Sequence, residues 1–168
     1  VIGAPQRAGR RRSASFGGEG LLPEPLHLVK GGVLQSSLLD TSTAKHLVLK
    51  SNARAARGVG GPPSPSSTNL YLAAGTKDVA SLLREIGDGL LVTELIGMGV
   101  NGATGDYSRG ASGFRIENGE LTYPVSEVTI AGNLKDMFLN MTPANDLTFR
   151  RGVNAPTVLV EGMTLAGL

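Results

Sequence analysis

Four consecutive polar residues, Asp106, Tyr107, Ser108 and Arg109, form the group in this chain most suited to chemistry. They lie in the Gly-rich segment TGDYSRG, where the glycines leave room for another backbone to approach closely. The group can be a self-contained turn, in which Asp106 accepts hydrogen bonds from local amides and pairs with Arg109. It can also supply contacts in a groove or a subunit interface, so both interpretations stay open at this stage.

The segment from Gly97 to Gly102 reads GMGVNG and matches the dinucleotide fingerprint G-x-G-x-x-G directly after a predicted strand. Glu117 lies near the position where the ribose-binding acid of such a fold is expected. However, the fingerprint needs a helix to begin at its third glycine, because the helix N-terminus holds the pyrophosphate. Here the next residues are ATGDYSRGAS, which favour a loop between strands and not a nucleotide site.

Residues for hydrolytic or metal chemistry are sparse. The chain has no cysteine and two histidines, and His27 and His46 are not spaced to place two imidazoles on one helical face. Ser108 and Ser112 lie outside a G-x-S-x-G pattern and have no nearby histidine in the sequence to act as a base. The sequence therefore predicts no catalytic residue and no metal ligand in this chain.

Apolar periodicity and turn signals predict the elements that must position these groups. Two hairpins are expected, at Gly31-Gly32 and at Asn118-Gly119. Helices are predicted over 40–49, 77–86 and 134–141, begun by Asp40 or Thr41, by Thr76 and by Asn133. Strands are predicted over 69–74, 90–97, 127–132, 147–150 and 157–160, and the second hairpin spans residues 113–125. These elements give an α+β fold with a predominantly antiparallel β-sheet and a few short helices.

Composition suits one domain, because 168 residues with 40% hydrophobic content can bury a single sizeable core. Residues 1–15 are expected to be a basic mobile arm or linker, and residues 16–168 the domain. Residues 1–20 carry a local charge of +3, so the net charge of +2 leaves the remainder near neutral. The low aromatic content of 4% disfavours nucleic-acid stacking. No apolar run reaches the roughly 20 residues that span a bilayer, and we expect a cytoplasmic protein.

The sequence closely resembles the C-terminal region of the TldD/PmbA family, in its PmbA (TldE) branch. The resemblance is carried by residues 31–47, 63–75, 89–141 and 145–167, the longest block including LLVTELIGMGVNGATGDYSRGASGFRIENGELTYPV. It runs from about Phe16 to the end of the chain, and the chain opens without Met or an apolar signal. We therefore expect a fragment of a longer protein that contains the C-terminal domain of this family.

The resemblance implies a role as well as a fold. TldD-like subunits of this family carry a metal site built from a His-Glu-x-x-x-His segment and a distant Cys, and they cleave unfolded peptides. TldE-like subunits pair with them and lack these ligands, and the final segment APTVLVEGMTLAG has no cysteine. The resemblance thus implies a metal-free partner subunit, with zinc in the TldD-like partner, an unfolded peptide as substrate and self-association as an option. Nucleic acid and membrane are not expected partners.

Two alternatives to the partner subunit stay open. The protein could be a zinc metallopeptidase in its own right with ligands upstream of this chain, or a regulator linked to DNA gyrase. Under the leading hypothesis, an extended peptide is held by backbone hydrogen bonds to a strand edge, and residues 99–113 are expected to form that edge. The residues predicted to contact a peptide groove or an interface are Asn101, Thr104, Asp106, Tyr107, Ser108, Arg109 and Asn133.

Overall fold

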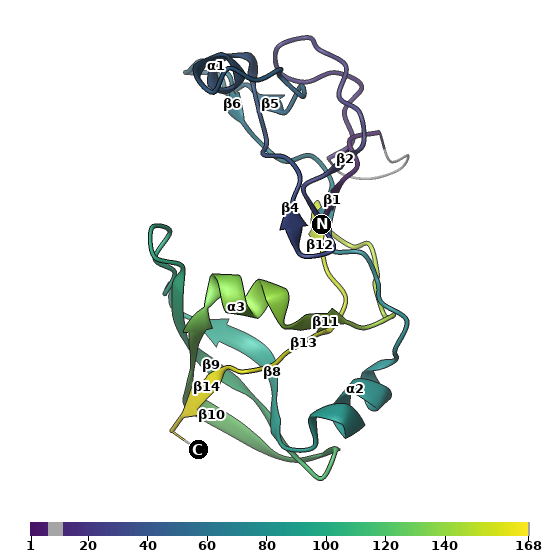
Figure 1. Ribbon diagram of the computed structural model, residues 1–168, viewed down its shortest axis with the longest axis vertical. Helices are drawn as coiled ribbons and strands as arrows, with labels where there is room; N and C mark the ends of the chain where they lie inside the picture. Colours follow the sequence, from purple (N-terminus) through teal and green to yellow (C-terminus); the bar gives the residue numbers. More distant parts are fainter. Residues whose placement is uncertain (7–11, 168) are drawn as a thin grey trace. The chain divides into compact units, whose positions relative to one another are not determined.

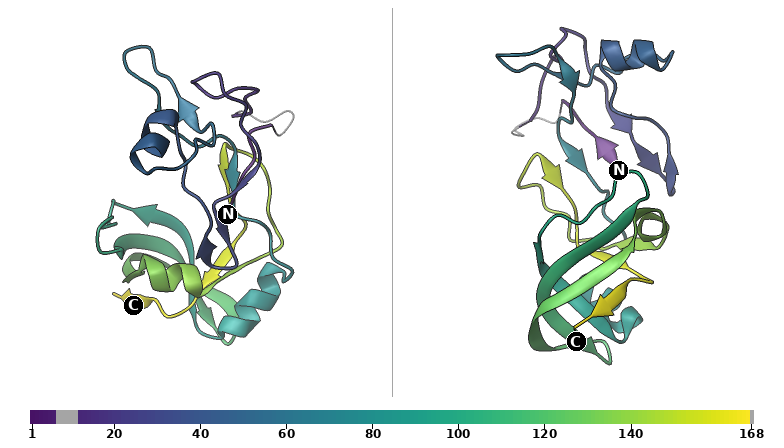
Figure 2. Two further views of the ribbon diagram at one scale, coloured as in Figure 1. Left: turned by 45° about the horizontal axis from the view of Figure 1, so that its top comes forward. Right: turned by 90° about the vertical axis from the view of Figure 1, so that its left-hand side faces the viewer.

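A computed structural model describes residues 1–6 and 12–167, and the chain divides into two compact units (Figures 1 and 2). Unit 1 comprises Val1–Ala73 and Leu147–Pro156, and unit 2 comprises Ala74–Asp146 and Thr157–Leu168. Antiparallel strands dominate and the helices are short, so the predicted α+β class is confirmed. Among the described residues, no helix is long and apolar enough to cross a membrane.

Unit 1 is built from very short strands. Its four-stranded sheet has the order β12, β7, β1, β2, formed by Val153–Asn154, Leu70–Tyr71, Ile2–Gly3 and Leu26–His27. Two separate hairpins pair β3 with β4 and β5 with β6, formed by Val29–Lys30, Val33–Leu34, Ala55–Ala56 and Ser64–Pro65. The first hairpin turns at Gly31-Gly32, both at positive φ, as predicted.

The segment predicted as a mobile arm contains part of this sheet. Ile2–Gly3 forms the interior strand β1, and the amine of Val1 donates a hydrogen bond to the Val29 carbonyl at 2.8 Å. Residues 7–11 of the predicted arm lie outside the described residues. The division of the chain at residue 15 stays a prediction.

Helix α1, Thr41–His46, begins as predicted at Asp40, whose carboxylate accepts from the Thr43 backbone N–H at 2.6 Å. Glu19 also accepts from the backbone N–H and the hydroxyl of Thr41. Two of the three acidic residues of unit 1 are thus bound at one helix N-terminus.

Unit 2 contains the large sheet and both hydrophobic clusters found among the described residues. The sheet has the order β14, β10, β9, β8, formed by Thr164–Ala166, Glu120–Asn133, Asp106–Glu117 and Gly89–Ile96. β9 and β10 turn at Asn118-Gly119, with φ of 52° and 80°, as the sequence predicted. Ala111, Val128 and Ile130 form the buried centre of this sheet.

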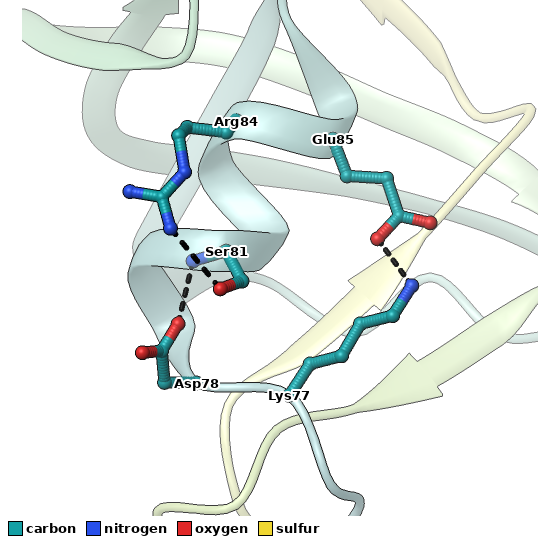
Figure 3. A network of polar contacts seen from close by, with 5 residues as sticks. All are labelled: Lys77, Asp78, Ser81, Arg84 and Glu85. Carbon is teal, nitrogen blue, oxygen red and sulfur yellow. Dashed lines mark hydrogen bonds and ion pairs between the residues drawn. The ribbon is translucent and has the colours of Figure 1, made fainter.

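Helix α2, Val79–Ile86, packs Leu82 against Ala144 and Leu159 in the second cluster. The predicted cap at Thr76 is wrong, because Asp78 begins the helix and accepts from the Ser81 backbone N–H at 2.7 Å. The Lys77 ammonium pairs with Glu85 at 2.5 Å alongside (Figure 3).

The remaining elements of unit 2 follow β10. Helix α3, Leu134–Leu139, begins at Asn133 as predicted. Strands β11, Met141–Pro143, and β13, Val158–Val160, pair antiparallel. The strand predicted over 147–150 is wrong. Residues 147–156 belong to unit 1, where Val153–Asn154 forms β12 and pairs in parallel with β7.

Acidification is expected to remove stability that two aspartates supply. Hydrogen bonds from Thr43 lower the pKa of the Asp40 carboxyl, and those from Thr157 lower the pKa of Asp146. Because both pKa values are lowered in the folded state, the stabilisation is present above about pH 4 and is lost as the pH falls through the folded values.

The measurement compares thermal midpoints of wild type with Asp40→Asn and Asp146→Asn, since Asn can still accept these hydrogen bonds but does not titrate. The advantage of wild type at neutral pH should shrink below about pH 4. A constant difference between wild type and the variants across that range would contradict the assignment.

Candidate functional site

The loop before β9 is held by a network of polar side chains that includes four of the predicted site residues. The Asn101 side chain accepts from the backbone N–H of Thr104 at 3.3 Å, and the Thr104 hydroxyl donates to Asp106 at 2.6 Å. Asn133 donates from Nδ2 to the Thr104 carbonyl at 3.1 Å and to Asp106 at 3.3 Å. Asn133 therefore links the end of β10, where it also caps α3, to the loop 101–106.

The backbone of this loop folds back on the start of β9. The Ser108 N–H donates to the Gly99 carbonyl at 2.8 Å, and the Asn101 N–H donates to the Asp106 carbonyl at 2.9 Å. Gly99 has no room for a side chain, because a Cβ there would lie 1.6 Å from the Ser108 carbonyl oxygen. The contact between the backbones of Gly99 and Ser108 therefore fixes the positions of Tyr107 and Ser108 relative to the loop.

A surface hollow of about 590 Å³ lies over this turn. It is lined by Met98, Gly99, Val100, Asn101, Gly102, Asp106, Tyr107 and Ser108. Met98 is fully exposed, and Val100 is half-exposed, so the rim presents aliphatic side chains beside the polar network. Sequence reasoning missed Met98, and it included Gly99 and Val100 in the expected strand edge without naming them as contact residues. The signal available was a pair of apolar residues set between glycines in GMGVNG, which no buried strand or helix would require.

Arg109 lies apart from this group. One of the two open interpretations, a turn in which it pairs with Asp106, is wrong, because side chains three positions apart on one strand point to opposite faces of the sheet. The Arg109 Nη2 instead donates to the Leu95 carbonyl at 3.3 Å, and its buried Nε has no hydrogen-bond partner within the described part of the chain. The predicted loop over 106–109 is also wrong, since these residues begin β9.

Strands β8 and β14, and not residues 110–113, form the two edges of the large sheet. Residues 110–113 of β9 pair with β8 on one side and with β10 on the other, so the predicted edge is wrong there. The outer side of β8 has no strand partner in the part of unit 2 that the structure describes. Leu95 and Ile96, at the end of β8, are 39% and 54% exposed. Exposed aliphatic side chains at the end of this edge strand are thus followed along the chain by the residues that line the hollow.

The described residues do not form the nucleotide site or the metal site that the sequence analysis considered. Gly97–Gly102 leads into a turn and then β9, so no helix follows to bind a pyrophosphate. His27 lies in β2 and His46 ends α1, and both are exposed. Within residues 1–6 and 12–167, no three His, Asp or Glu side chains lie close enough to hold a metal ion, so the described donors do not fit one.

Comparison with known proteins identifies the family. The model of the PmbA/TldA metallopeptidase C-terminal domain matches residues 1–167. Metalloprotease PmbA of Escherichia coli O157:H7 is 45% identical over 156 residues, which cover 92% of this chain and 33% of the relative. This chain thus spans about a third of that relative's length.

Two solved structures share the fold. A proposed modulator of a DNA gyrase from Thermotoga maritima has a TM-score of 0.84 at 31% identity, covering 98% of this chain and 38% of that one. TldE from Thermococcus kodakarensis has a TM-score of 0.87 at 22% identity, covering 99% of this chain and 39% of that one. The chain belongs to the PmbA/TldA metallopeptidase C-terminal domain family.

Proposed function

We propose that this chain is the C-terminal part of a metal-free TldE-type subunit, which acts in the cytoplasm with a TldD-like metallopeptidase subunit. In this assembly the zinc ion belongs to the TldD-like partner, and unfolded peptides are cleaved there. The chain described here helps to form the walls that hold the peptide. Family membership and the fold shared with TldE support the proposal.

The observation that carries the peptide-holding role is the unpaired edge of β8, a strand that ends at Ile96, shortly before the first residue lining the hollow. An extended peptide can add to such an edge through backbone hydrogen bonds, which place little demand on its sequence. Leu95, Ile96 and Met98 offer exposed aliphatic surface to its side chains. Asn101, Asp106 and Ser108 lie where polar contacts to the same peptide or to the partner subunit are available.

The first experiment separates the partner role from independent catalysis. The full-length protein is purified alone and then mixed with a TldD-like subunit from the same source, and zinc content and cleavage of an unfolded peptide are measured. The proposal expects neither zinc nor turnover in the protein alone, and turnover in the mixture. Stoichiometric zinc with turnover in the protein alone would establish the second candidate, a metallopeptidase in its own right. The name metalloprotease carried by the Escherichia coli relative favours that candidate.

A double variant tests the contact residues. Asp106→Ala with Arg109→Ala removes the carboxylate that accepts from Thr104 and the guanidinium that donates to the Leu95 carbonyl. We expect peptide turnover by the mixture to fall about tenfold, because a contact that positions the peptide is lost. The matched control is Glu120→Ala with Lys135→Ala, which removes one exposed acid and one exposed base from the same unit. If both double variants assemble and turn over peptide like wild type, the contact assignment is lost.

A further inference from the structure

The charges of this chain separate between its two units. Unit 1 contains eleven Lys and Arg against three Asp and Glu, a formal charge of +8. Unit 2 contains five Lys and Arg against eleven Asp and Glu, a formal charge of −6. The small net charge of the whole chain, +2, is therefore the sum of two oppositely charged units. A unit with such an excess of one sign attracts partners of the opposite sign.

The cations of unit 1 are available to a partner. Seven described Lys and Arg side chains of this unit are exposed, namely Arg12, Lys30, Lys45, Lys50, Arg57, Arg150 and Arg151. Both ion pairs among the described residues lie in unit 2. Glu19 and Asp40 are bound at the start of α1, so Glu24 is the single exposed acid of the unit. In the part of unit 1 that the structure describes, these cations therefore form no ion pair with an acidic side chain.

The segment Lys45–Lys50, KHLVLK, combines this charge with apolar surface. Leu47, Val48 and Leu49 are 55%, 91% and 59% exposed, and a lysine stands at each end. Three consecutive large aliphatic residues that all face solvent are unusual on a folded surface and typically mark an interaction site.

The backbone holds Val48 in a conformation that its side chain disfavours. The Leu49 N–H donates to the Ala44 carbonyl at 2.8 Å and the Val48 N–H to the Lys45 carbonyl at 3.2 Å, which is the Schellman pattern at a helix end. Val48 occupies the position that usually holds glycine, and its φ is 55°, an outlier for a β-branched residue. A strained aliphatic side chain displayed to solvent indicates a role outside the fold of this unit.

We propose that the segment Lys45–Lys50 is a docking site for acidic polypeptides that carry aliphatic side chains. Carboxylates of the partner would meet Lys45 and Lys50, and its aliphatic side chains would cover Leu47, Val48 and Leu49. The inference deepens the proposed function by naming a class of peptide. It is tested by binding to the full-length protein without the TldD-like subunit, so its failure and the failure of the partner role are distinguishable.

A polypeptide fits this surface better than a nucleic acid does. Single-stranded nucleic acids bind through aromatic stacking combined with positive charge. Among the Phe, Tyr and Trp side chains in the described part of unit 1, Phe16 is the exposed one, whereas Tyr71 and Phe149 contact each other edge to face at 5.2 Å. The apolar side chains beside the lysines are aliphatic, and they match Leu, Ile or Val of a peptide.

The test measures fluorescence anisotropy of a labelled peptide rich in Glu and Leu. Lys45→Glu with Lys50→Glu is expected to weaken binding about tenfold, because like charges then face the peptide. Val48→Gly is expected to weaken binding roughly fivefold through lost apolar contact, while the thermal midpoint stays the same or rises. Lys135→Glu, in the acidic unit, serves as the matched control and should leave the affinity unchanged. Raised salt should weaken binding.

Two control peptides test the aliphatic and the acidic side chains of the probe separately. A peptide in which Ser replaces Leu should bind more weakly, and one in which Lys replaces Glu should not bind. Three results would overturn the proposal: tighter binding of a single-stranded oligonucleotide of equal charge, unchanged affinity in both the lysine and the Val48 variants, or absence of peptide binding. In the last case, self-association in sedimentation that the lysine variant abolishes would assign the segment to a second copy of this chain.

Discussion

Replacing Gly99 with alanine is expected to lower the free energy of unfolding by about 3 kcal/mol, near the upper end for single substitutions. The new methyl carbon would lie 1.6 Å from the Ser108 carbonyl oxygen, a separation that no rotamer can relieve because the clash is with the backbone. The turn must open, and the hydrogen bond from the Ser108 N–H to the Gly99 carbonyl is lost with it. Urea unfolding of the full-length protein measures the change.

Gly102→Ala is the matched control for this substitution. Gly102 lies in the same loop, and a Cβ there would meet no atom within 4 Å. Its effect should stay within about 0.5 kcal/mol. Because the Gly99 turn also shapes the hollow, peptide turnover by the mixture should fall in Gly99→Ala and persist in Gly102→Ala. Equal unfolding free energies for the two variants would show that the close approach to Ser108 does not exist in solution.

Elements fixed by local chemistry could be predicted from the sequence. Asn118-Gly119 supplies the positive φ that a tight hairpin needs, and Asp40 and Asn133 each place a side-chain oxygen at a helix start. The failure at α2 has a local cause as well. Thr76 and Asp78 both offer capping oxygens, and the sequence alone does not decide which one reaches the first free N–H.

The site itself depended on tertiary pairing that local patterns do not contain. The glycines around Asp106 favour a loop, yet pairing with β10 draws residues 106–109 into β9. That pairing sends Asp106 and Arg109 to opposite faces and leaves β8 as one of the two edge strands. The separation of charge between the units could not be predicted from the sequence for a related reason. Unit 1 includes residues 147–156, which contribute Arg150 and Arg151 although they lie far along the chain from the rest of the unit.

Replacing Arg54 with methionine is expected to destabilise unit 1 by about 3–5 kcal/mol, because a buried charged side chain that makes three hydrogen bonds is lost. Arg54 is 1% exposed and is the largest fully buried side chain of the described residues, and burial lowers the pKa of its guanidinium. It donates to the Thr68 hydroxyl at 2.8 Å and to the Gly3 carbonyl at 3.4 Å, and it also bonds the Glu24 carbonyl.

These three acceptors explain why one side chain has so large an expected effect. Gly3 belongs to β1, Glu24 precedes β2 and Thr68 precedes β7, so Arg54 joins three neighbouring strands of one sheet. Both buried hydrophobic clusters identified among the described residues lie in unit 2, which leaves unit 1 more dependent on polar contacts. Methionine fills much of the volume but offers no donor, so all three of these hydrogen bonds are lost.

Hydrogen exchange distinguishes this effect from general unfolding. In Arg54→Met, amides of β1 and β7 should lose protection, whereas amides of β9 and β10 should keep it, because the second sheet has its own core. Arg57→Met is the matched control, since Arg57 is exposed three residues further along and should change neither region. Arg54→Lys should fall between the two, because an ammonium keeps the charge without the planar fork that reaches three acceptors. Uniform loss of protection in both units would show that the two units unfold as one, and would contradict a stabilising role confined to unit 1.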